Sequence, residues 1–182
     1  MTHPLERAKK LSQIMRHAVL ALGLIVGAVA LGALCYSVTD AGFLPSLLRA
    51  RFGAFAPSSV SALQLLLFMA LLVVQTAPLL MALLFLWRAF GAIALNGGVD
   101  VSTALLVRGT GLWFGAAALL MLVSTPLMSL ISSIGAIAGR RFLSVEFEVQ
   151  HLLAVLLSAV LITLGHVLAL AADIADDNRL IV

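Results

Sequence analysis

Long apolar runs dominate this chain, and charged residues occur only between them. Four intervals contain no Asp, Glu, Lys or Arg, and they cover residues 17–39, 52–87, 109–139 and 149–172. Their lengths are 23, 36, 31 and 24 residues. A helix needs about 20 residues to cross a hydrocarbon core of about 30 Å. Each interval is therefore long enough to cross a bilayer once.

Local sequence features set the bounds of four predicted membrane-spanning helices, at about 17–39, 60–90, 103–133 and 149–172. Pro57 and the two serines after it favour a helix start, and the Asn96-Gly97-Gly98 stretch predicts a loop. Asp100 or Ser102 can cap the helix that follows this loop. The second span exceeds the core by about ten residues, so it must tilt, kink or project from the membrane.

Prolines and glycines mark special positions in the spans. Pro78 and Pro126 lie inside the second and third spans, where each predicts a kink. Glycines four residues apart let two helices approach closely in lipid, and this spacing occurs twice within the predicted spans. The residues concerned are Gly23 and Gly27 in the first span, and Gly111 and Gly115 in the third. They predict packing faces, within one chain or between two copies.

Two connectors carry their own patterns. Residues 40–57 predict a short interfacial segment, because Leu44, Leu47, Leu48, Phe52 and Phe55 share one face if the segment coils. Arg51 falls on the same face, where it can snorkel to the headgroups. Residues 144–149 alternate polar and apolar as a short strand does. A bent lead-in to the fourth helix explains that alternation equally well.

Composition narrows the class of protein. Of the 182 residues 63% are hydrophobic and 10% charged, whereas about a quarter are charged in soluble domains. The net charge is only +3, and no basic run lies beside stacking aromatics, so nucleic acid is excluded as a partner. The single Cys35 excludes an intrachain disulfide and a two-cysteine metal motif.

The expected fold is an all-α integral membrane protein, a bundle of four transmembrane helices. Residues 1–16 form a basic segment, and residues 173–182 an acidic tail. If the N-terminus is cytoplasmic, the inner side holds seven Lys and Arg residues and the outer side four. The positive-inside rule thus places both termini in the cytoplasm.

Few ionisable groups lie at membrane depth, where they are functional candidates. His166, Asp173 and Asp177 fall within about 20° of one helix face. They suggest a proton relay or a weak divalent-metal site. The preferred interpretation is that His166 bonds a neighbouring helix while the acids lie in water. Because carboxylates are unfavourable at a helix C-terminus, the tail is expected to fold back towards the basic residues on its side, Arg88, Arg108, Lys9 and Lys10, with Arg108 and Asp173 as a pair.

Polar residues also accompany the two prolines. Gln75 lies near Pro78, and several hydroxyl residues surround Pro126. A transporter needs a polar midplane site of this kind. The preferred interpretation is that these groups satisfy backbone atoms released by proline. No nucleophile elbow, phosphate-binding loop or zinc motif is present in the sequence, so we expect no enzyme activity, no cofactor and no metal.

The order of features resembles a known family. Leu86-Trp87-Arg88-Ala89-Phe90 precedes a glycine break and Arg108-Gly109, and the chain ends in acid-Asn-x-x-Ile-Val. With four spans, this resembles the bacterial membrane proteins grouped as domain of unknown function 2975, from about residue 18 to the end. Val99 and Asp100 stand where that family often has a Phe. The resemblance implies a multi-pass protein of the bacterial inner (plasma) membrane, sometimes accompanied by small helix-turn-helix regulators. It transfers no catalytic residues.

Two hypotheses about function follow. The first is a non-enzymatic interaction protein that signals to a cytoplasmic partner or regulator through residues 91–108 and the acidic tail. The alternative is a small-solute or ion transporter component that works around Pro78, Pro126 and His166. The expected partners are the lipid bilayer, a cytoplasmic protein and a second copy of the chain.

Overall fold

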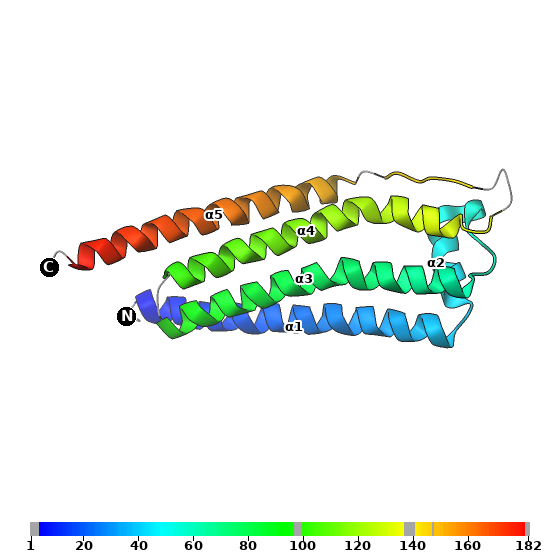
Figure 1. Cartoon of the computed structure of the whole chain (residues 1–182). Coiled ribbons are helices and arrows are strands. Elements are labelled where there is room, and N and C mark those ends of the chain that lie inside the picture. The colour runs from blue at the N-terminus through cyan, green and yellow to red at the C-terminus, as the bar shows by residue number, and fades with distance from the viewer. Residues whose placement is uncertain (1–3, 97–99, 137–140, 147, 181–182) are drawn as a thin grey trace.

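The computed structural model describes residues 4–96, 100–136, 141–146 and 148–180. Over these residues the chain is helical and contains no β-strand. The elements are α1 (Pro4–Thr39), α2 (Phe43–Phe52), the 3-10 helix η1 (Gly53–Phe55), α3 (Ala62–Asn96), α4 (Val101–Ser132) and α5 (Val149–Leu180). The prediction of an all-α chain with four helices that could span a membrane is confirmed (Figure 1).

The first and last helices extend beyond the spans predicted for them. α1 begins at Pro4, where proline suits the first helical turn, and continues without a break past residue 16. α5 continues to Leu180 because residues 166–180 contain neither glycine nor proline to end it. The acidic tail therefore prolongs α5, and the prediction that it folds back towards Arg108 is wrong over its described residues.

Side chains fix the start of α3. Ser61 and Gln64 form a reciprocal capping box, in which the Ser61 amide donates to Gln64 Oε1 over 2.9 Å and the Gln64 amide donates to Ser61 Oγ over 3.3 Å. The buried Gln64 amide group also donates to the carbonyls of Ile131 and Ile134, over 3.1 and 3.0 Å. One glutamine thus caps α3 and ties it to the end of α4.

Asp100 caps α4, one of the two residues expected in that role. Its Oδ1 accepts the Thr103 amide over 2.8 Å and the Thr103 hydroxyl over 2.5 Å, and the Ser102 hydroxyl donates to the same carboxylate over 3.0 Å. These hydrogen bonds, led by those from Thr103, lower the pKa of Asp100. At the other end of α4, the Ser129 hydroxyl accepts the Ser144 amide over 3.0 Å. The described part of residues 144–149 is a lead-in to α5 and not a strand.

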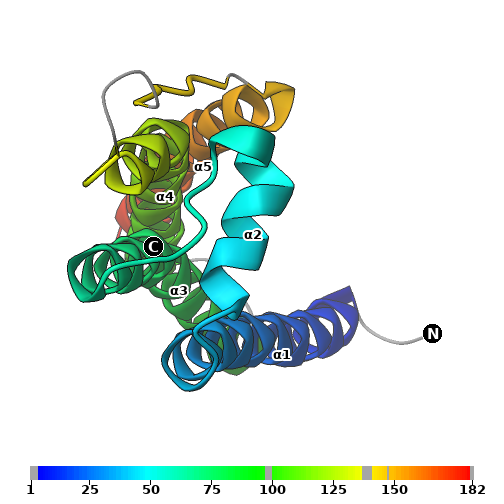
Figure 2. The same cartoon turned by 90° about the vertical axis from the view of Figure 1, so that its right-hand side faces the viewer.

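The long helices pack in chain order, α1 on α3, α3 on α4 and α4 on α5. α2 crosses one end of this row, and both chain termini lie at the other end (Figures 1 and 2). Leu48 and Phe52 of α2 are buried there against Phe68 of α3. The row is curved and not a symmetric bundle, and α1 and α5 lie at its two edges (Figure 2).

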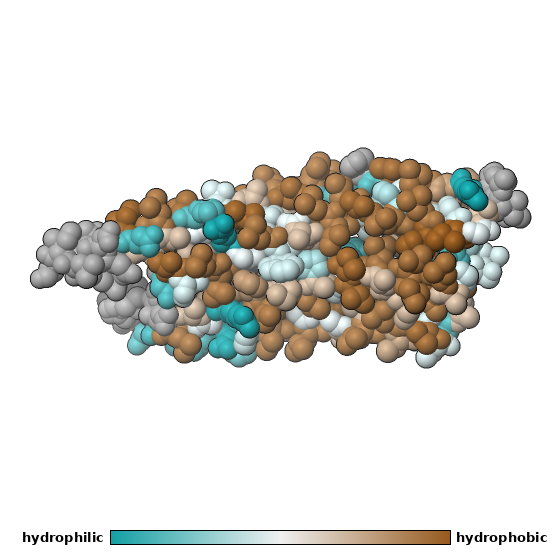
Figure 3. All heavy atoms as spheres, in the orientation of Figure 1, coloured by the Kyte–Doolittle hydropathy of each residue, from teal (hydrophilic) through white to brown (hydrophobic). Residues whose placement is uncertain are grey.

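Hydrophobic side chains cover most of the visible surface (Figure 3). Each long helix contains a stretch apolar enough to cross a membrane, and these are Lys9–Thr39, Ala62–Leu95, Val101–Ser132 and Val149–Ala175. Exposed leucine and valine side chains are costly in water but lie naturally against lipid tails. The chain is therefore that of a multi-pass membrane protein.

Candidate functional site

α1 and α3 each carry an arginine near the end where the termini lie, and the arginine of α1 contacts a tryptophan of α3. The Arg16 guanidinium of α1 lies over the Trp87 ring of α3, with its Cζ 4.6 Å from the ring centroid. Arg88 follows Trp87 directly and is exposed. Arg16 and Arg88 therefore lie at nearly the same level along the helix axes.

Arg108 of α4 and His166 of α5 lie at the same level along the helix axes as Arg16 and Arg88. A Cβ at Gly165 of α5 would lie 2.7 Å from the Arg108 backbone nitrogen, which places His166 and Arg108 at similar positions along their helices. Gly109 in turn faces the Phe85 ring of α3. Since each residue rises about 1.5 Å, Arg16, Arg88, Arg108 and His166 lie within about one turn of each other along the axis. We call these four residues the basic level.

The opposite end of the helices carries an ionic cluster. Arg51 Nη2 of α2 lies 2.8 Å from Glu146 Oε2 and 3.7 Å from Glu148 Oε1, and it donates to the Thr125 hydroxyl over 3.1 Å. Sequence reasoning missed the cluster, although an arginine on the apolar face of residues 40–57 was a signal for it.

The two charged ends are one bilayer apart. From Arg108 in the basic level to Ser132 at the end of α4, the helix is about 36 Å long at about 1.5 Å per residue. The hydrocarbon core is about 30 Å thick, and arginines can reach the headgroups by snorkelling. The basic level and the Arg51 cluster are therefore separated by about the thickness of a bilayer.

Helices α4 and α5 are in close contact through Gly111 and Gly115. A Cβ at Gly111 would lie 2.8 Å from the Ile162 backbone nitrogen, and one at Gly115 would overlap the Ser158 hydroxyl. The buried Ser158 hydroxyl donates to the Gly111 carbonyl over 2.8 Å. Close backbone approach and an interhelical hydrogen bond thus occur together, as is common in lipid. Sequence reasoning missed Ser158 and Ile162, the partners of these glycines on α5.

The other glycine pair lies in a more open place. A Cβ at Gly23 would be 3.9 Å from Leu83 of α3, and one at Gly27 would have no described neighbour within 4 Å. Gly23 and Gly27 therefore border a space between α1 and α3.

The predicted polar face on α5 is exposed where the structure describes it. His166 and Asp173 are both exposed, and the Asp177 side chain lies outside the described residues. Among the described residues no group of three His, Cys, Asp or Glu side chains could hold a metal ion. Arg108 and Asp173 do not form an ion pair, since Asp173 lies about two turns beyond Gly165, the neighbour of Arg108.

Hydroxyl groups near the prolines bond to their own helices. Thr76 donates to the Leu72 carbonyl over 2.7 Å, and Ser124 donates to the Met121 carbonyl over 2.7 Å. Pro78 and Pro126 both lie inside continuous helices. The carbonyls that Pro78 and Pro126 leave without an amide donor are those of Val74 and Leu122, four residues earlier, so these two hydroxyls do not satisfy them.

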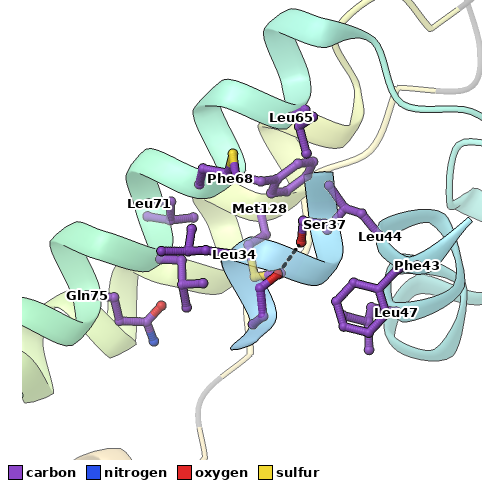
Figure 4. A pocket seen from close by; sticks show the side chains of 13 residues that line it. Leu34, Ser37, Phe43, Leu44, Leu47, Leu65, Phe68, Leu71, Gln75 and Met128 are labelled. Carbon is purple, nitrogen blue, oxygen red and sulfur yellow. Dashed lines mark hydrogen bonds between the residues drawn. The ribbon is translucent and has the colours of Figure 1, made fainter. Parts of the chain in front are cut away.

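Gln75 lies at the edge of a mainly apolar hollow of about 160 Å³ between α1, α2 and α3 (Figure 4). The other polar side chain that lines it, Ser37, donates to the Ala33 carbonyl over 2.7 Å. Phe68 and Met128 close the hollow towards α3 and α4 (Figure 4). Among the side chains that line this hollow, Gln75 carries the amide that could form hydrogen bonds with a bound ligand.

Beyond the basic level, α1 and α5 each carry an exposed apolar stripe. On α1 the stripe is Leu11, Ile14 and Met15, and on α5 it is Val167, Leu170 and Ile174. Ile14 is 64% exposed and Leu170 is 62% exposed. Leu11 is three and four residues from Ile14 and Met15, and the α5 residues follow one another at three and four residues, so each set lies on one side of its helix. Such stripes near a membrane surface are suited to contact with another protein or with lipid.

Comparison with family models, with curated proteins and with solved structures found no match to this chain. The resemblance to domain of unknown function 2975 therefore stays a prediction based on its own residues.

Proposed function

We propose that this chain is a non-enzymatic interaction protein of the bacterial inner membrane, with both termini in the cytoplasm. It signals the state of the membrane to a cytoplasmic partner protein. The observation that supports this proposal is the pair of apolar stripes beyond the basic level. On α1 the helix continues for about 18 Å past Arg16, and on α5 for about 21 Å past His166, at about 1.5 Å per residue.

The stripes suit helix-in-groove recognition. In that mode a partner binds anchors spaced by three, four and seven residues on one face of a helix. The charges around them supply a polar rim, with Lys9 and Lys10 exposed on α1 and Asp173 exposed on α5. Opposite charges on the two helices would orient the partner and disfavour proteins whose charges do not match. Leu95 and Leu105, exposed near the ends of α3 and α4, would enlarge the same apolar surface.

Photocrosslinking in intact cells tests this proposal. A photoreactive residue at Leu170 should capture a protein, whereas one at Leu156, which is equally exposed but lies at bilayer depth, should capture lipid. Replacing Ile174 by Lys, or ending the chain after Ala172, should abolish the protein adduct. If Leu170 and Leu156 give the same lipid adducts, the stripe lies in the bilayer and the proposal is wrong.

The alternative proposal, a solute transporter component, is supported by Gln75 at the hollow of Figure 4. In that case Gln75→Ala or His166→Ala should abolish solute uptake by proteoliposomes, while removal of residues 173–182 should not affect it. The interaction proposal predicts the reverse sensitivity, since the partner contacts only the ends of the helices.

A further inference from the structure

A groove runs along the outer seam between α1 and α3. It consists of two hollows of about 310 and 260 Å³, which share Leu80 of α3. Gly23 lines the first hollow and Gly27 the second, so α1 presents bare backbone to both. The remaining lining is almost wholly apolar. In a bilayer such a groove holds lipid tails, because water has no polar partners there.

The end of the groove at the basic level is cationic. Trp87 lines the first hollow, and the Arg16 guanidinium lies over its ring. Gly91 makes room for this arginine, since a Cβ there would lie 3.5 Å from Arg16 Nε. Leu80, Leu84 and Arg88 follow one another at four-residue spacing, which rotates by only about 40° per step. Arg88 therefore flanks the same groove.

Neither Arg16 nor Arg88 forms an ion pair with an acidic side chain among the described residues. They lie at headgroup depth beside a tryptophan, the residue type enriched at membrane interfaces. Guanidinium groups bind phosphate strongly through charge-assisted hydrogen bonds. The charge at the rim and the apolar groove below it together match one kind of molecule, an anionic phospholipid.

We propose that the α1–α3 seam binds an anionic phospholipid, with its phosphate between Arg16 and Arg88 and one acyl chain along Gly23 and Gly27. Such a lipid would fill the space beside α1, which contacts its neighbouring helix less closely than α4 does. The site is separate from the apolar stripes, so it does not depend on the partner protein proposed above.

Native mass spectrometry of the full chain with added phosphatidylglycerol or phosphatidylcholine of the same acyl chains tests the headgroup part. The double variant R16Q/R88Q should bind phosphatidylglycerol about 30-fold more weakly, at about fivefold per arginine near a charged headgroup. Its binding of phosphatidylcholine should not change. The matched control R49Q/R108Q removes the same charge outside the seam and should bind both lipids like the parent chain.

Filling the groove tests the acyl-chain part. Gly27→Leu should weaken retention of both lipids at least fivefold, while Gly32→Leu should not, because Gly32 lines neither hollow. Neither glycine has a described neighbour within 4 Å of its Cβ position, and leucine favours a helix, so both variants should fold. The proposal is wrong if R16Q/R88Q and R49Q/R108Q weaken phosphatidylglycerol equally. It is also wrong if Gly27→Leu breaks a dimer but leaves lipid binding unchanged, since a second copy would then occupy the seam.

Discussion

Helices α1 and α4 carry the same glycine spacing, yet they pack differently. Gly111 and Gly115 of α4 lie against the backbone and a buried hydroxyl of α5. Gly23 and Gly27 of α1 border an open groove against α3. Glycines at this spacing therefore permit close approach without causing it.

The opposing helix explains the difference. α5 presents Ser158 to Gly115 and Gly165 to the backbone of Arg108, and these small residues let the two helices approach until Gly111 lies against the Ile162 backbone. α3 presents Leu80 and Leu83 to α1, and their branched side chains keep the helices apart. In lipid, helix association depends on packing and interhelical hydrogen bonds because burial from water supplies no driving force. The α4–α5 contact should therefore be the strong one and the α1–α3 contact the weak one.

Alanine at the two glycine positions should give the largest contrast. Gly111→Ala would place a Cβ 2.8 Å from backbone, so α5 must move away, at a cost of about 2 to 3 kcal/mol in the free energy of unfolding. Gly27→Ala meets no described atom and should be neutral or stabilise by up to about 1 kcal/mol, since alanine favours a helix. Reversible unfolding in mixed micelles measures both. Equal losses would show that α1 packs as tightly as α4.

Ser158→Ala should have the next largest effect. It removes the hydrogen bond to the Gly111 carbonyl and should lower the free energy of unfolding by about 1 kcal/mol. Thr163→Ser is a suitable control in the same helix, because the exposed Thr163 hydroxyl donates to Ala159 of its own helix and serine keeps that bond. The same unfolding measurement applies. No loss for Ser158→Ala would mean that backbone approach alone holds α4 to α5.

Asp100→Ala tests whether the cap at the start of α4 supports the strong contact. Loss of the cap should cost about 1 kcal/mol at neutral pH. The folded pKa is lowered by the Thr103 and Ser102 hydrogen bonds, so the stabilisation is complete above the ordinary pKa of an aspartate, about 3.9. It is lost as the pH falls through the lower folded value.

Unfolding measured from pH 7 to pH 3 checks this sign. The difference between Asp100→Ala and the parent chain should shrink below about pH 4. Asp100→Asn keeps a capping oxygen but no titrating group, so its own stability should show no change at this position over that range. A difference that grows at low pH would contradict the assigned role of the carboxylate.

Trp87→Leu should produce the smallest change, in the weak α1–α3 contact. It removes the stacking of Arg16 and should cost about 0.5 to 1 kcal/mol, as cation–π pairs at exposed sites do. Trp113→Leu on α4 is a matched control, since that tryptophan is exposed and makes no cation–π contact among the described residues. A loss as large as that of Gly111→Ala would reverse the ranking of the two contacts.

The spans could be predicted from the sequence, because hydropathy and chain length alone decide what can cross a bilayer. The Asp100 cap could also be predicted, since it is a local signal. Local pattern could not reveal which glycine pair is closely packed, because that depends on Ser158 and Ile162, about 50 residues away. For the same reason the contacts of Arg51 with Thr125 and Glu146 required the tertiary structure. The tail acids misled the prediction because α5 has no stop signal before them.

Cysteine accessibility in oriented membrane vesicles tests the central claim most directly, that α1 and α5 leave the membrane on one side with their apolar stripes exposed. In a Cys35→Ser background, Ile14→Cys and Leu170→Cys should react with a membrane-impermeant maleimide only in inverted vesicles. Ser58→Cys, beyond the other end of the helices, should react only in right-side-out vesicles. Contradiction would come from labelling of residues 14 and 170 from opposite sides, or from Leu170→Cys being as protected as a Leu156→Cys control.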